Sequence, residues 1–77
     1  MTNRILTKTE RLHRVLHLIR LWNATVPVGS RVTVAGESRP FYVTTSPARE
    51  RHGEPVINLD HMSRAHLYDV DVLEDRP

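Results

Sequence analysis

The sequence contains no cysteine among its 77 residues. Disulfide bridges, thiolate metal sites and cysteine nucleophiles are therefore excluded, and the absence fits a reducing compartment. No apolar run approaches the ~20 residues that a membrane-spanning helix needs. The first residues, MTNRILTKTERLHR, lack the apolar core of a signal peptide. We therefore expect a cytoplasmic protein without a membrane partner.

Glycine and aromatic residues are also scarce. Three glycines leave no glycine-rich phosphate loop, and no serine stands in a nucleophile elbow. We therefore expect no enzyme, no catalytic residues and no cofactor. The four aromatic residues are too few for a proline-rich peptide groove or an extended stacking platform. A chain of this length forms one small domain, residues 1–77, with a thin core.

Charge is distributed unevenly along the chain. Residues 1–39 carry seven Lys or Arg and two Glu, a net charge of +5, whereas residues 40–77 carry four Arg and seven Asp or Glu, a net charge of −3. This asymmetry can steer a charged partner, or it can reflect solvation alone.

An amphipathic helix is expected over residues 7–23. Thr7 and Glu10 fit a capping box, Asn23 can end the helix in a left-handed conformation, and Pro27 blocks continuation. Apolar residues recur at three- and four-residue spacing and predict one buried stripe. They are Leu12, Val15, Leu16, Ile19 and Trp22.

After the helix, the hydrophobic period changes from 3.6 to 2, which predicts strands. They are expected over residues 31–34, 41–45, 56–60 and 67–73, the last entered through a short helical turn. Residues 46–54 are expected to form a mobile loop, 61–64 a tight connection and 74–77 a frayed tail. The predicted fold is α+β: the N-terminal amphipathic helix packs on a small antiparallel SH3-like β-barrel of four to five strands, over residues 28–73.

Two segments carry a family resemblance. Residues 21–24 (LWNA) followed by 27–32 (PVGSRV) resemble short phage and prophage proteins with an N-terminal helix, a W-N-x-x-x-P-V-G-x-x-V junction and a small SH3-like barrel. Residues 45–48 (TSPA) and 65–73 fall where that pattern has its second and last strands. The segment Met62-Ser63-Arg64 replaces the Gly-Cys or aromatic segment that such proteins often have. The resemblance implies an SH3-like fold and an accessory role inside a bacterial host, with no catalytic residues to transfer.

The first candidate site is the basic flank of the helix. Leucines lying between arginines suit a protein partner or a homodimer better than a phosphate groove, and a solvated helix face is the alternative. The candidate partner-binding residues are Arg11, Arg14, Leu18, Arg20 and Leu21.

A second candidate patch combines a hairpin with the 46–54 loop. Small barrels bind nucleic-acid strands or peptides through aromatic residues among basic loop residues. The candidate nucleic-acid-binding residues are Arg39, Tyr42, Arg49 and Arg51.

Two further patterns are compatible with metal binding or acid–base chemistry, but each has a simpler structural explanation. His13 and His17 have the i, i+4 spacing of metal ligands but no accompanying HExxH glutamate, so a polar flank is favoured over a metal site. Asp69 and Asp71 alternate with valine, as on the outward face of an edge strand. No metal is expected.

Three functions follow from these sites. The leading prediction is a non-enzymatic, phage-type accessory module that binds a protein partner, with a host machine or a defence complex as candidates. The first alternative is a nucleic-acid-binding small barrel protein. The second is a homo-oligomeric structural component, in which Leu18 and Leu21 would be buried between subunits.

Overall fold

The computed structural model describes residues 7–73, which begin with the cap of helix α1 (Lys8–Thr25). The predicted capping box is confirmed: the Glu10 amide donates to Thr7 Oγ1, and the Thr7 amide donates to Glu10 Oε1, each at 3.1 Å. The helix does not end at Asn23 as predicted. It continues to Thr25, and the Val26 amide donates to the carbonyl of Trp22 at 2.7 Å. No helix within residues 7–73 is long and apolar enough to cross a membrane.

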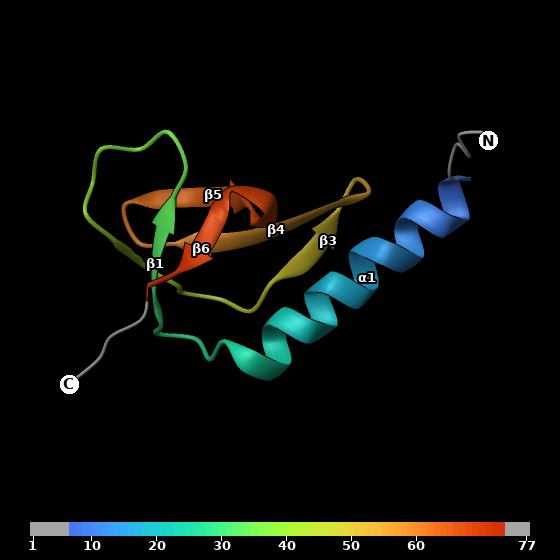
Figure 1. Ribbon diagram of the computed structural model, residues 1–77, viewed down its shortest axis with the longest axis horizontal. Coiled ribbons are helices and arrows are strands. Elements are labelled where there is room, and N and C mark those ends of the chain that lie inside the picture. The colour runs from blue at the N-terminus through green and yellow to red at the C-terminus, as the bar shows by residue number, and fades with distance from the viewer. Residues whose placement is uncertain (1–6, 74–77) are drawn as a thin grey trace, which may run out of the picture.

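Two small antiparallel sheets follow the helix (Figure 1). The first has the strand order β2-β1-β6 and the second β3-β4-β5. The fold is therefore α+β as predicted, but it has six short strands instead of four to five, and the sheets do not form a closed barrel. The strands are β1 (Arg31–Val34), β2 (Tyr42–Val43), β3 (Arg49–Arg51), β4 (Glu54–Leu59), β5 (Met62–His66) and β6 (Val70–Val72), with a 3₁₀ helix η1 (Leu67–Asp69) before β6. The predicted frayed tail, 74–77, lies outside the described residues.

The predicted loop 46–54 is wrong, because its second half forms the β3–β4 hairpin. Arg51 and Glu54 are paired across a two-residue turn, and both turn residues have positive φ, 51° at His52 and 82° at Gly53. Positive φ at both positions defines the type I′ turn that suits a two-residue hairpin. The predicted connection 61–64 is also wrong in part, since β5 already begins at Met62.

The two sheets are joined through the end of β2. Thr44 forms an isolated antiparallel bridge with Leu59, and the Thr45 amide donates to the carbonyl of Asn58 at 3.0 Å. The side chain of Asp60 accepts from the Val43 amide at 2.7 Å. The sheets therefore enclose one core from two sides.

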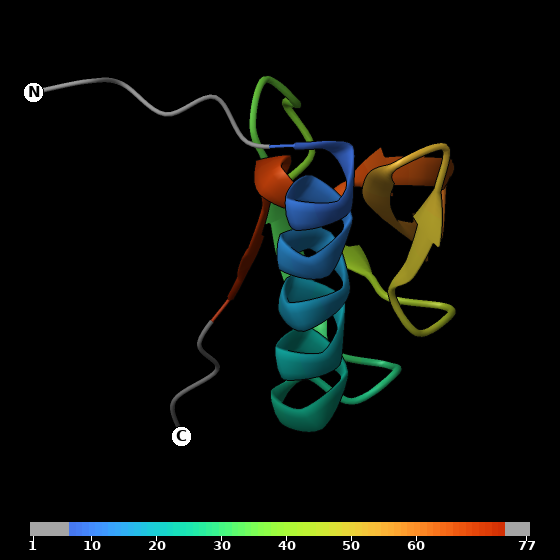
Figure 2. The same cartoon turned by 90° about the vertical axis from the view of Figure 1, so that its right-hand side faces the viewer.

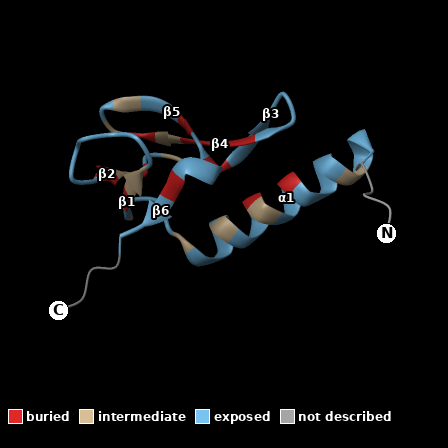
Figure 3. Ribbon diagram, turned by 45° about the horizontal axis from the view of Figure 1, so that its top comes forward, coloured by how far each residue is buried: buried red, intermediate tan, exposed pale blue. Residues whose placement is uncertain are grey.

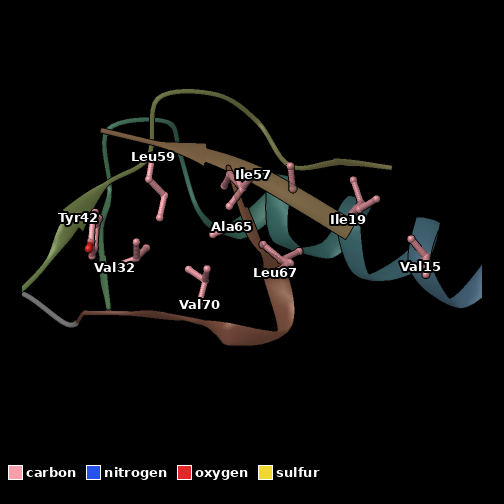
Figure 4. Close-up of a cluster of buried hydrophobic side chains, with 10 residues drawn as sticks. Val15, Ile19, Val32, Tyr42, Ile57, Leu59, Ala65, Leu67 and Val70 are labelled. Atoms are coloured by element: carbon pink, nitrogen blue, oxygen red, sulfur yellow. The ribbon is translucent and has the colours of Figure 1, made fainter. Parts of the chain in front are cut away.

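That core is a single cluster between the sheets and the helix (Figure 4). From α1 it receives Val15 and Ile19, which are buried, and Leu18 and Trp22, which are partly buried. Viewed end-on, α1 lies across the sheets beside the β3–β4 hairpin (Figure 2). The other buried members of the cluster are Val32, Tyr42, Ala48, Ile57, Leu59, Ala65, Leu67 and Val70.

The predicted helix stripe is wrong at its N-terminal end. Leu12 and Leu16 are 39% and 37% exposed, while Leu18, expected on the surface, packs against the core. The buried part of α1 is confined to its middle, and its first turns lie past the main body of the sheets (Figure 3). Leu12 therefore stays partly exposed, near the tip of the β3–β4 hairpin.

Replacing His52 with asparagine should raise the free energy of unfolding by about 0.5 kcal/mol. A left-handed conformation is unfavourable for most side chains, and asparagine followed by glycine is the preferred type I′ pair. Urea denaturation measures the effect. The matched control is His17→Asn, an exposed helical position where asparagine offers no gain. Equal responses of the two variants would contradict the turn assignment.

Candidate functional site

The candidate site is the outer face of the β3-β4-β5 sheet. Ile57 on β4 belongs to the core cluster, whereas Val56 is only 3% exposed yet lies outside that cluster. Successive side chains of a strand point to opposite faces. Val56 therefore lies on the outer face, where its register partners are Arg49 on β3 and His66 on β5.

Basic side chains surround Val56 on this outer face. Arg51 lies on the same side of β3 as Arg49, and Arg64 alternates with the buried Ala65 on β5. We call the set Arg49, Arg51, Arg64 and His66 the basic sheet face; all four residues are exposed.

One acidic residue, Glu54, stands at an outward position of these three strands, opposite Arg51. With histidine neutral, the outward positions therefore carry three positive charges and one negative charge. Asn58 lies near the bulge between Ile57 and Leu59, and its Oδ1 atom is buried without a hydrogen-bond partner. The exposed residues of the face are thus basic and polar, and they surround the buried Val56.

The predicted nucleic-acid patch is divided by the fold. Arg49 and Arg51 belong to the basic sheet face, but Arg39 lies in the loop before β2 and Tyr42 lies on β2, a strand of the other sheet. The Tyr42 ring is buried in the core, and its hydroxyl donates to Glu37 Oε1 at 3.3 Å. Burial and the Glu37 carboxylate raise the pKa of Tyr42. Its ring is a core component and not an open stacking surface.

Arg39 is held in its own loop. Its guanidinium lies 5.7 Å from the centre of the Tyr42 ring, and its Nε donates to the carbonyl of Phe41 at 3.2 Å. These contacts hold Arg39 against its own loop.

The predicted partner-binding set on α1 is also divided. Arg14 and Arg20 are six residues apart, which places them about 120° apart around a helix. Leu18 is partly buried against the core. Arg11, Arg14 and Leu21 remain on one flank, where Leu21 is 54% exposed.

The remaining candidate residues lie on α1, η1 and β6. His13 and His17 are both exposed on α1. Asp69 and Asp71 are exposed, and Asp71 is opposite Thr33 on β1. Within residues 7–73 there is no group of three or more His, Asp or Glu side chains arranged to hold a metal ion.

Arg64 and His66 are the members of the basic sheet face that the sequence analysis missed. The alternation of Arg64 and His66 around Ala65 was a usable strand signal, but Arg64 fell in the expected connection 61–64, and residues 65 and 66 were assigned to no strand. Exposed guanidinium groups on the two outer strands of this sheet can donate charge-assisted hydrogen bonds to phosphate oxygens. Comparison with protein-family models, curated proteins and solved structures gives no match.

Proposed function

We propose that this chain is a nucleic-acid-binding domain whose basic sheet face contacts the phosphate backbone. The main observation is that Arg49, Arg51 and Arg64 are exposed on one face of one sheet, where they come from its two outer strands. Two residues along a strand span about 7 Å, and two strand spacings span about 10 Å. The three guanidinium groups are therefore spread widely enough to bind separate phosphates.

The composition of the face favours backbone contacts over base recognition. Its outward positions hold arginine, glutamate, valine, asparagine, serine and histidine, so that the imidazole of His66 is the one ring among them. Stacking platforms for single strands use several aromatic rings, whereas phosphate contacts carry no sequence information directly. We therefore infer binding with little dependence on sequence.

The salt dependence of binding tests this function. If three phosphates are neutralised, the logarithm of the binding constant should fall with the logarithm of salt concentration with a slope of about −2.7 on duplex and about −2.1 on a single strand. Fluorescence anisotropy of labelled oligonucleotides between 20 and about 300 mM salt measures the slope. Affinity that does not change with salt would contradict phosphate binding.

A protein partner docked on α1 is the second candidate. Leu21, more than half exposed, lies seven residues from Arg14 and thus on the same side of the helix. If this flank binds a protein, Leu21→Ser should abolish a defined band captured from nuclease-treated bacterial lysate. The matched control is Val28→Ser, at a residue 55% exposed outside the helix. If both variants capture the protein band equally well, α1 does not bind this partner through Leu21.

We also propose two finer assignments that the resemblance favours. The first is an SH3-like fold, supported by six short strands in two three-stranded antiparallel sheets around one core. The second is a non-enzymatic accessory role in a phage or prophage, with a cytoplasmic location in the bacterial host. Its support is the junction formed by residues 21–24 and 27–32.

A further inference from the structure

An open groove separates the first turns of α1 from the β3–β4 hairpin. Its volume is about 640 Å³, and it lies on the side of the hairpin that faces the helix. The helix wall presents Lys8, Arg11 and Leu12, and the hairpin wall presents Glu50 and Glu54. The groove borders the basic sheet face at Glu54, which is opposite Arg51. Glu50 alternates with Arg49 and Arg51 on β3 and therefore points to the other side of the strand.

The two walls carry opposite charges that do not meet within the chain. No ion pair crosses the groove among the residues that the structure describes. Glu50 Oε2 accepts a hydrogen bond from the Gly53 amide at 2.6 Å, which holds its carboxylate in place beside the turn. The positive end of the helix dipole reinforces the basic wall.

An apolar strip also leads into the groove. Leu12 lines it, and Leu16 lies one turn further along α1. Both leucines are more than one-third exposed, although Val15 and Ile19 beside them are buried in the core. The apolar side of the helix thus continues beyond the point where the sheets cover it.

We propose that this groove is the interface of a two-fold symmetric homodimer. In such an interface, residue i contacts residue j of the partner, and j contacts i. A two-fold axis through the groove therefore sets each basic helix wall against the partner's acidic hairpin wall and brings the two Leu12 side chains together. The groove is complementary to itself in charge, whereas its glutamates would repel a nucleic-acid backbone. The small apolar centre predicts a weak dimer, with a Kd of about 1 μM or above.

Charge reversal tests this interface. Sedimentation velocity of the full chain should show a concentration-dependent monomer–dimer equilibrium. Arg11→Glu and Glu50→Arg should each raise the dimer Kd at least about tenfold, because each creates two like-charge contacts. Mixing the two variants one to one should restore the dimer, since both contacts of the mixed dimer then join opposite charges. Arg20→Glu, which changes the charge equally on another side of α1, should leave the Kd unchanged.

The mixture separates this proposal from its alternatives. A salt bridge within one chain could be repaired by combining both reversals in the same chain but not by mixing two chains. A native chain that stays monomeric up to about 1 mM, or folded variants that fail to associate on mixing, would overturn the dimer. Circular dichroism establishes that the variants fold; should Glu50→Arg fail to fold, Leu12→Ser provides the second test and should also raise the Kd.

Discussion

Replacing Arg49 and Arg64 together with alanine should lower the affinity for duplex DNA about 60-fold at 0.1 M salt. Each phosphate contact contributes about −0.9 to the log–log salt slope, so two lost contacts reduce the slope by about 1.8. If the native and the variant chain bind DNA equally at 1 M salt, a slope difference of about 1.8 gives an about 60-fold difference in affinity at 0.1 M salt. Anisotropy titrations of native and variant chains measure both the affinity and the slope.

The matched control for this pair is Arg14→Ala with Arg20→Ala. It removes the same charge from α1, whose arginines lie away from the basic sheet face. The control should bind with nearly native affinity. Equal losses in the two double variants would show that binding follows net charge alone, and a larger loss in the control would move the site to the helix.

Replacing Asn23 with alanine should lower the free energy of unfolding by about 2 kcal/mol. The Asn23 side chain donates from Nδ2 to the carbonyl of Ala48 at 3.0 Å and accepts from the Ala48 amide at 2.9 Å. Ala48 is buried, so both of its backbone groups would lose their partner, at about 1 kcal/mol or more for each group. This pair of bonds ties α1 to the residue directly before Arg49.

The neighbouring control for Asn23 is Thr25→Ala. The Thr25 hydroxyl is exposed and donates only to carbonyls of its own helix, at 2.9 Å to Leu21. Its removal should change the free energy of unfolding by less than about 0.5 kcal/mol in urea denaturation. An Asn23→Ala variant as stable as this control would contradict a stabilising role for the two Asn23–Ala48 hydrogen bonds.

The elements that could be predicted from the sequence are those with strong local signals. The capping box at Thr7 and the alternation of 31–34 fixed α1 and β1, because both depend on neighbouring residues alone. The β3–β4 hairpin was not predicted, because histidine before glycine is a weak turn signal and because a charged segment with a proline resembles a loop. The helix end was misplaced because the Asn23 side chain bonds to Ala48, 25 residues away, instead of capping its own helix.

The candidate site was predictable only in part. Arg49 and Arg51 were chosen for their charge, but their neighbours depend on strand pairing, which brings Val56 and His66 alongside. Counting charge over residues 40–77 concealed the basic sheet face, because Asp69 and Asp71 in that half of the chain lie on η1 and β6. The burial of the Tyr42 ring was not predicted, because it depends on the packing of the two sheets and not on the local strand pattern.

Chemical-shift mapping by NMR tests directly whether the basic sheet face binds nucleic acid. Duplex DNA is titrated into the ¹⁵N-labelled chain, and the amide and arginine side-chain resonances are followed. We expect the largest shifts at five residues of the sheet, with α1 nearly unchanged: Arg49, Arg51, Val56, Arg64 and His66. Shifts confined to Arg11, Arg14 and Leu21, or none at saturating DNA, would contradict a nucleic-acid site on the basic sheet face.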